Sequence, residues 1–348
     1  MGTQDFRVPE WWIIGWPTAG RSAPMARQCE EAGWDGLLLT DTQCLGHDTY
    51  VELAMCVART ERIQLGTGVT NPVTRDVAVM AAAAATLQEE SGGRMHLGIG
   101  RGDSSLAYIG KKGAPLSQME AYIRALQAYL RGELVDRDGF ASSLTWLNKG
   151  VDKVPVDMAG TGPRVIRMAA EIADGINFAV GADTERLAAK IAQVEENLRE
   201  VGRDRASFKI SAYINCAVND DVAKARDVVR GTAAVVARFS AMHGKQASSD
   251  LSEEDRAAVD QVARSYDMLA HASSDATHAR EMPDSFLDRF AVVGAADAVA
   301  QRLGEIAGLG LDRVMLVWGS RHADPAAVEH SVAALSTEVL PALRAAAP

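Results

Sequence analysis

Short aliphatic runs alternate along the chain with longer amphipathic segments. The short runs have the length and β-branched content of buried strands, whereas the longer segments repeat their apolar positions with a helical period. This alternation predicts repeated strand–helix units around a parallel sheet. Eight strands are predicted, over Trp11–Gly15, Gly36–Thr40, Ile63–Val69, Met95–Gly100, Val154–Ala159, Gly175–Val180, Lys209–Val218 and Arg313–Trp318.

Helix start and stop residues agree with this pattern. Asp76 and Asp183 precede helical segments as capping residues do, and Pro163 and Pro325 open two others. Glycines, at Gly33, Gly202 and Gly310, follow predicted helices where C-terminal caps are common.

We therefore expect an α/β fold, a (β/α)8 TIM barrel formed as one domain by residues 1–348. A doubly wound open sheet shares the alternation, but no nucleotide-binding fingerprint follows the first predicted strand. Two segments interrupt the repeat, Leu134–Lys153 and His243–Arg289. Long excursions in barrels tend to cover the active face, and the second is predicted to be a lid.

Composition excludes several classes of function. The net charge is −10, from 36 basic and 46 acidic residues, and no basic stripe favours nucleic acid as a partner. No signal peptide or membrane-spanning run is found, so a cytoplasmic protein is expected. The four cysteines and seven histidines lack metal-ligand spacing, so we predict buried free thiols and no metal site.

Glycine-rich turns end the third and fourth predicted strands, where a barrel places its active site. The third strand ends in Gly66-Thr67-Gly68-Val69-Thr70-Asn71-Pro72, and its glycines would let the backbone approach a flat ligand. The fourth runs into Gly100-Arg101-Gly102-Asp103-Ser104-Ser105. Arg101 is a candidate for binding phosphate or carboxylate, and Asp103 for accepting a proton. An ordinary strand-to-helix turn is the alternative for either segment.

Other candidates lie at the same predicted end of the barrel. The turn Gly160-Thr161-Gly162 opens a helix at Pro163 and offers free N–H groups to an anion, although such a turn is also a common helix start. Trp16 and Trp318 follow the first and last strands, where they would line a substrate pocket or plug the barrel. Asp41 ends the second strand.

Together these residues resemble the bacterial luciferase-like superfamily, and within it the coenzyme F420-dependent branch that includes methylenetetrahydromethanopterin reductase. The similarity covers most of the chain. It is carried by Leu65–Arg75, Ala85-Thr86-Leu87, Gly92-Gly93-Arg94, Leu97–Gly100, Gly160–Pro163, Ala173-Asp174-Gly175, Phe290–Gly294 and Gly310–Val314.

The resemblance implies an oxidoreductase that binds F420 and transfers hydride to or from a small organic substrate. It places a non-proline cis peptide behind the cofactor ring at Gly68-Val69, and phosphate-binding turns at Gly160–Gly162 and Val180-Gly181. Asp41, Thr70, Asn71 and the Gly100–Gly102 turn would complete the cofactor site. Many relatives have a histidine after the acidic residue of the second strand, but Thr42 follows Asp41 here. Asp103 occupies a position where some relatives use a carboxylate, so the resemblance makes it the candidate for proton transfer.

Two other functions are compatible with these residues. One is an FMN-dependent monooxygenase on the same barrel, and the other is a non-catalytic flavin-binding barrel. A homodimer or higher homo-oligomer is expected if the alanine-rich segment Val77–Leu87 packs against another subunit rather than its own barrel.

Overall fold

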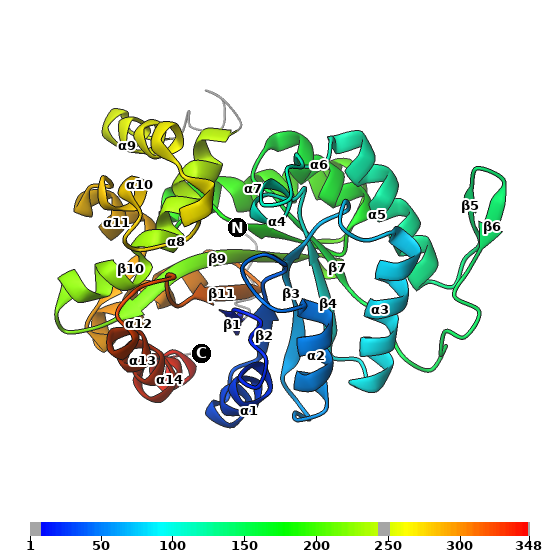
Figure 1. Ribbon diagram of the computed structural model, residues 1–348, viewed down its shortest axis with the longest axis horizontal. Coiled ribbons are helices and arrows are strands. Elements are labelled where there is room, and N and C mark those ends of the chain that lie inside the picture. The colour runs from blue at the N-terminus through cyan, green and yellow to red at the C-terminus, as the bar shows by residue number, and fades with distance from the viewer. Residues whose placement is uncertain (1–7, 243–250, 347–348) are drawn as a thin grey trace.

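The computed structural model describes residues 8–242 and 251–346, and its centre is a closed barrel of eight parallel strands (Figure 1). Strand β1 pairs with β2 on one side and with the last strand, β11, on the other. The barrel prediction is therefore confirmed, and an open doubly wound sheet is ruled out. The strands are β1 (Glu10–Gly15), β2 (Gly36–Leu39), β3 (Gln64–Thr70), β4 (Met95–Ile99), β7 (Val156–Ala159), β8 (Gly175–Phe178), β9 (Lys209–Val218) and β11 (Arg313–Val317).

Helices surround the barrel, and their caps agree with the sequence. Asp76, Asp183 and Asp324 each accept a backbone N–H of the helix that they precede, and Gly33 ends the first helix with φ of 87°. The larger helices are α1 (Ser22–Ala32), α2 (Thr49–Val57), α3 (Val77–Glu90), α5 (Leu116–Leu130), α6 (Pro163–Ile172), α7 (Thr184–Glu200), α8 (Val222–Met242), α12 (Ala296–Ala307), α13 (Pro325–Ala334) and α14 (Leu340–Ala345).

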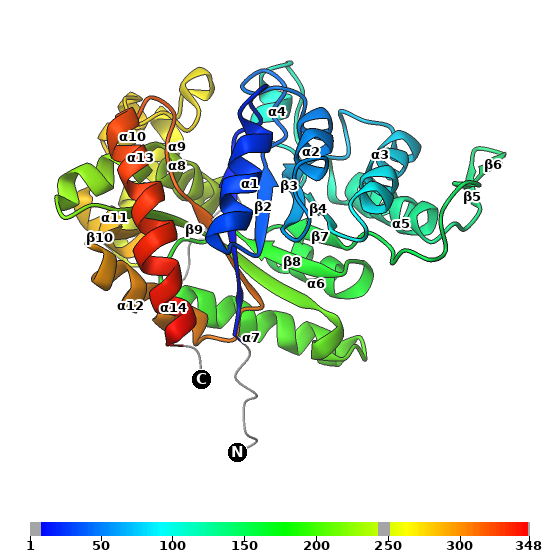
Figure 2. The ribbon, with the colours of Figure 1, turned by 90° about the horizontal axis from the view of Figure 1, so that it is seen from below.

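The first excursion differs from the expectation that it covers the active face. It forms a hairpin of β5 (Val135–Arg137) and β6 (Phe140–Ser142), which projects from the side of the barrel (Figures 1 and 2). Arg137 forms an ion pair with Asp76 beside α3, whereas Phe140 is 80% exposed. The hairpin follows α5 and precedes β7, so it belongs to a connection that leads back to the beginning of a strand.

The second excursion lies against the loops at the C-terminal ends of the strands. Residues 243–250 are outside the described residues; the remainder forms α9 (Glu253–Ser265), a 3-10 turn (Met268–Ala270), α10 (Thr277–Arg280) and α11 (Asp284–Phe290). Tyr108, in the loop after β4, donates to the carbonyl of Leu269, and Arg321, after β11, donates to that of His271. A short strand, β10 (Val292–Gly294), then pairs with β9. Whether the segment acts as a lid remains a prediction.

Inside the barrel, one bulky side chain, that of Trp12, fills the half nearer the N-terminal ends of the strands. Trp12 is fully buried, and a β-carbon added at Gly36 would lie 2.1 Å from its indole ring. Trp12 also contacts His96 edge-on, with ring centroids 5.0 Å apart. Ile14, Leu38 and Met315 complete this apolar interior cluster, whereas the larger core lies between the strands and the surrounding helices.

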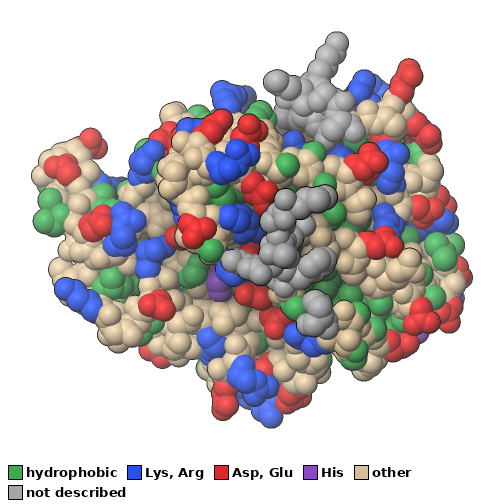
Figure 3. All heavy atoms as spheres, turned by 180° about the vertical axis from the view of Figure 1, so that it is seen from behind, with side chains coloured by type: hydrophobic (Ala, Val, Ile, Leu, Met, Phe, Trp, Pro, Cys, Tyr) green, Lys and Arg blue, Asp and Glu red, His purple; other side chains and the backbone are tan. Residues whose placement is uncertain are grey.

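The N-terminal end of the barrel is polar and hollowed. Figure 3 shows this face, with a histidine in a hollow among basic and acidic side chains. A cavity of about 810 Å³ opens here, lined in part by His96, Lys209 and Arg313. Arg313 forms ion pairs with Asp157 at 2.6 Å and Glu10 at 3.2 Å. Burial, together with the charge of Arg313, holds the pKa of His96 well below its usual value. The cavity lies opposite the end where barrels carry active sites.

Two expectations from composition concern thiols and apolar helices. All four cysteines are free; Cys29, Cys56 and Cys216 are buried as predicted, but Cys44 is exposed in the loop after β2. Within residues 8–242 and 251–346, we find no helix with the length and apolar character needed to span a membrane.

Candidate functional site

The C-terminal ends of the strands bring the predicted site segments together around the barrel mouth. At β3 the register with β4 shifts between Thr67 and Thr70, which marks a bulge. The Gly68–Val69 peptide within it is cis, as the family resemblance implied. Gly68 and Val69 are half-buried, so this part of the strand presents backbone and one methyl-bearing side chain at the mouth.

Two glycines of the neighbouring strand fit closely against the bulge. A β-carbon at Gly98 would lie 2.4 Å from the carbonyl oxygen of Thr67, and one at Gly100 would lie 3.2 Å from a methyl of Val69. The N–H of Gly100 donates to the carbonyl of Thr70. The glycines of β4 thus leave room for the side chain of Val69, and the bulge packs closely against the end of β4.

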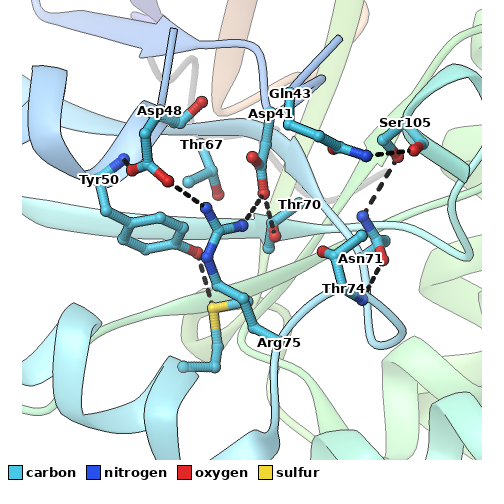
Figure 4. A network of polar contacts seen from close by, with 12 residues as sticks. Asp41, Gln43, Asp48, Tyr50, Thr67, Thr70, Asn71, Thr74, Arg75 and Ser105 are labelled. Carbon is cyan, nitrogen blue, oxygen red and sulfur yellow. Dashed lines mark hydrogen bonds and ion pairs between the residues drawn. The ribbon is translucent and has the colours of Figure 1, made fainter. Parts of the chain in front are cut away.

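Asp41 is the centre of a polar network beside the β3 bulge (Figure 4). Its carboxylate accepts hydrogen bonds from the hydroxyl of Thr70 at 2.6 Å and from the guanidinium of Arg75 at 2.8 Å. Arg75 also pairs with Asp48, and the side chain of Asp41 is only 3% exposed. The side chains of Asp41 and Thr70 therefore tie β2 to β3 and position the bulge from below.

The aromatic ring of Tyr50 supports Arg75. The guanidinium lies 4.5 Å from the ring centroid, and the phenol donates to the sulfur of Met80. Burial raises the pKa of Tyr50, and the nearby carboxylate of Asp41 raises it further, so the phenol is neutral.

The loops after β2, β3 and β4 are held to one another by side chains. Asn71 accepts the backbone N–H groups of Val73 and Thr74 and donates to Ser105. Gln43 donates to the carbonyl of Ser105 (Figure 4). The fully buried amide of Asn71 thus shapes its own loop rather than facing the mouth.

Asp103 has an arginine partner that the sequence did not indicate. Both of its carboxylate oxygens accept from one nitrogen of Arg238, at 2.7 and 2.6 Å, and both side chains are more than four-fifths buried. Arg238 comes from α8, and its guanidinium stacks 4.8 Å from the ring centroid of Tyr266. The hydroxyl of Tyr266 is hydrogen-bonded to His271. Burial lowers the pKa of His271 to about 4.

The other residues of the predicted β4 turn are used locally. The guanidinium of Arg101 donates to the carbonyl of Ala114 at 2.6 Å. Gly102 has φ of 91°, and a β-carbon there would meet Leu106 at 2.4 Å. This turn therefore requires glycine for conformation and for space, and Arg101 anchors the loop that follows.

The predicted phosphate-binding turns end β7 and β8, which are neighbouring strands. Gly160, Thr161 and Gly162 are half-buried, and Gly162 directly precedes the first turn of α6, where Pro163 leaves the helix N-terminus open. After β8, Val180 is buried, and Gly181 has φ of 85° and packs against Phe290. The two turns lie side by side because β7 pairs with β8.

The two predicted pocket tryptophans also occupy neighbouring positions. Trp16 directly follows β1 and Trp318 directly follows β11, and these strands pair. Both side chains are half-buried, and that of Trp318 packs against the main core between the strands and the helices.

Sequence reasoning missed the polar residues that face the inside of the barrel. Asn177 of β8 and Asn215 of β9 are each 1% exposed. The alternation along β9 was the available signal, since polar Ser211, Tyr213 and Asn215 occupy every second position. Across the part of the chain that the structure describes, no cluster of His, Cys, Asp and Glu could hold a metal ion.

Comparison with known proteins gives consistent results. The family model described as luciferase-like monooxygenase matches residues 15–313. The 5,10-methylenetetrahydromethanopterin reductase of Methanolobus tindarius is 30% identical over 305 residues, which cover 84% of this chain and 88% of that protein. The enzyme of the same name from Archaeoglobus fulgidus is 28% identical over 295 residues, covering 82% and 86%.

Solved structures share the fold. The coenzyme F420-dependent tetrahydromethanopterin reductase of Methanopyrus kandleri superposes with a TM-score of 0.74 at 20% identity, covering 96% of this chain and 99% of that one. An F420-dependent secondary alcohol dehydrogenase, in complex with an F420–acetone adduct, gives 0.74 at 17% identity, covering 97% and 100%. A monooxygenase from Streptomyces bottropensis gives 0.68 at 18% identity, covering 95% and 99%.

Proposed function

The chain belongs to the luciferase-like monooxygenase family, and from this we propose that it is an F420-dependent oxidoreductase acting on a small organic molecule. The two 5,10-methylenetetrahydromethanopterin reductases cover more than four-fifths of the chain, and the solved F420-dependent enzymes share its fold over nearly its full length. These similarities support hydride transfer as the reaction.

The observation that carries the proposal is the close packing of the β3 bulge against the glycines of β4 at the mouth. The side chain of Val69 lies over Gly98 and Gly100, with methyls 3.1 and 3.2 Å from their β-carbon positions, and the bulge would serve as a platform for a planar ring. The turns Gly160–Gly162 and Val180–Gly181 lie at the same end, on strands β7 and β8, where free N–H groups would hold a phosphate. A planar ring joined to a phosphate matches both parts.

When bound, F420 supplies a ring carbon that gives or takes a hydride. The chain's residues would hold the ring against the bulge, align the substrate beside it and exclude water. Asp41, Thr70 and Arg75 act beneath the bulge as positioning residues. Trp16 and Trp318 form part of the substrate pocket in this proposal.

We assign the proton transfer to Asp103. Its carboxylate lies at the end of β4, and Arg238 fixes its orientation from the opposite side. The usual histidine is replaced by Thr42, whose hydroxyl lies 3.4 Å from that of Ser104, so this position holds a loop contact instead of an acid. Replacement of Asp103 by Asn should lower kcat while leaving F420 affinity within about threefold of wild type.

The experiment that tests the proposal is titration of the purified protein with oxidised F420 and, separately, with FMN, followed by fluorescence quenching. Tight F420 binding and substrate-dependent change of its absorbance are expected. Binding of neither cofactor would refute the proposal and support a non-catalytic barrel.

The second candidate is an FMN-dependent monooxygenase, which the structural similarity to a monooxygenase favours. Both cofactors combine a tricyclic ring with a phosphate, so both fit the platform and the turns. Oxygen consumption that depends on reduced FMN, with weak F420 binding, would support this candidate over the first.

Two parts of the proposal concern the surroundings of the site. The excursion that includes α9 and α10 would serve as a lid, since it contacts the loops carrying Tyr108 and Arg321.

The chain would form a homodimer through α2 and α3, which expose Val51, Met55 and Val79 by half or more. Sedimentation of wild type against Val79→Lys measures this association, and a monomeric wild type would refute it.

A further inference from the structure

One wall of the barrel mouth is polar and uncharged. Along β9 the residues Ile210, Ala212, Ile214 and Cys216 pack outward into the main core, so the alternate residues face the barrel interior. Tyr213 and Asn215 are interior residues in the middle of this strand. Asn177 is the corresponding interior residue of the neighbouring strand β8.

Several polar atoms on this wall lack hydrogen-bond partners. Both amide atoms of Asn215 and the amide oxygen of Asn177 are buried without one among the described residues. The nitrogen of Asn177 has only a long contact, 3.4 Å, to the hydroxyl of Tyr213. Buried polar atoms are normally paired, so a group of this size at one place points to a missing partner.

The unpartnered atoms lie at the depth of the proposed ring platform. A β-carbon at Gly98 would lie 3.1 Å from a methyl of Val69 and 3.6 Å from the amide nitrogen of Asn177, which places this amide beside the bulge. Asn215 is in register with Val317, which is in turn level with Ile14 and Leu38. Leu38 reaches within 3.0 Å of the β-carbon position of Gly68, so Asn215 stands at the same level on another wall.

The remaining walls at this level differ in character. Ile14, Leu38 and Met315 are apolar, and they belong with Trp12 to the interior cluster. Two carboxylates near the mouth are already paired with arginines, Asp41 with Arg75 and Asp103 with Arg238. A ligand that satisfies Asn177 and Asn215 therefore needs an uncharged polar edge on one side and an apolar body on the other.

We propose that Asn177, Tyr213 and Asn215 form a subsite that binds the lactam edge of the cofactor's tricyclic ring. A primary amide presents two donors and one acceptor, which complement the alternating N–H and C=O groups of such an edge. The subsite is separate from the phosphate-binding turns, because it lies inside the barrel on the inward faces of β8 and β9. This inference rests on the proposed function, since it requires that a deazaflavin or flavin occupies the mouth.

The test uses Asn177→Leu and Asn215→Leu, which keep side-chain size but remove the hydrogen-bonding atoms. Binding is measured by fluorescence quenching for F420 and for a deazaflavin that carries a ribityl chain but no phosphate. Each variant should bind both probes about 5- to 20-fold more weakly, because the lost contacts lie on the ring. The shift of the deazaflavin absorption band on binding should also shrink. Asn197→Leu, on the outer helix α7, is the matched control.

Thermal unfolding of the variants without ligand separates a ligand site from a structural role. Removing an amide that has no internal partner should raise the Tm of Asn215→Leu or leave it unchanged. A lower Tm with unchanged affinity for both probes would overturn the inference, because the amide would then serve the fold. Wild-type protein that binds neither F420 nor FMN would refute the proposed function and this subsite together, whereas unchanged binding by both variants would refute the subsite alone.

Discussion

The network around Asp41 makes a quantitative prediction for the variant Arg75→Gln. The carboxylate of Asp41 is 3% exposed and loses its ionic partner in this variant, while the bond from Thr70 remains. Removing one member of a buried ion pair costs about 3 kcal/mol or more, because the other charge is left uncompensated. Loss of the stacking on Tyr50 adds about 0.5 to 1 kcal/mol. We expect the free energy of unfolding to fall by about 3.5 to 4 kcal/mol, on the sum of these two effects.

Urea unfolding followed by circular dichroism measures this loss, and Arg137→Gln provides the control. Arg137 makes a comparably short ion pair with Asp76, but both side chains are more than 40% exposed, so its replacement should leave the free energy of unfolding nearly unchanged. The double variant with Asp41→Asn should recover about 2 kcal/mol relative to additivity, since the neutral amide no longer needs the guanidinium. Equal losses for Arg75→Gln and Arg137→Gln, or additive effects of Asp41→Asn and Arg75→Gln, would refute the reasoning.

Three further predictions concern other parts of the molecule. Gly98→Ala should destabilise the protein by about 2 kcal/mol in urea unfolding, because its β-carbon would meet the Thr67 carbonyl at 2.4 Å. The control Gly304→Ala, in open space on α12, should stabilise the protein by up to about 1 kcal/mol. Equal effects of the two substitutions would contradict this explanation. Because the pKa of His271 is lowered to about 4, the unfolded chain binds a proton at this residue before the folded protein does as pH falls from about 6.5. The free energy of unfolding of the wild type should therefore decline towards pH 4 by up to about 3 kcal/mol more than that of His271→Asn. Parallel curves of stability against pH for the two proteins would contradict this. Arg238→Gln should lower kcat as Asp103→Asn does, and combining them should add little; full additivity in kcat would show that the two residues act separately.

The architecture was predictable because its signals are local and repeated. Each strand is a short apolar run, and residues such as Asp76, Asp183 and Pro163 mark helix starts through backbone chemistry that does not depend on distant contacts. The hairpin Val135–Ser142 was not found, because its short strands are largely exposed and lack an alternating apolar face.

The backbone of the site was predictable in the same way, and its side-chain partners were not. Glycine turns at Gly68, Gly100 and Gly160 could be placed at strand ends from the sequence. The pairing of Asp103 with Arg238 joins residues 135 positions apart, and nothing in the local pattern of α8 distinguishes Arg238 from a solvent-exposed arginine. The inward direction of Asn177 and Asn215 depends on the register of β8 and β9, which closure of the barrel fixes.

The indole of Trp12 restricts the routes by which small molecules can reach the barrel mouth. It occupies the axis of the barrel between Gly36 and His96, and Arg313 stacks on it from the N-terminal side. Trp12 and Arg313 thus close the N-terminal end of the barrel interior, and the large hollow at that end does not communicate with the mouth along this axis. In the proposed function, small molecules would therefore reach the mouth past the loops at its open end and not from the N-terminal hollow.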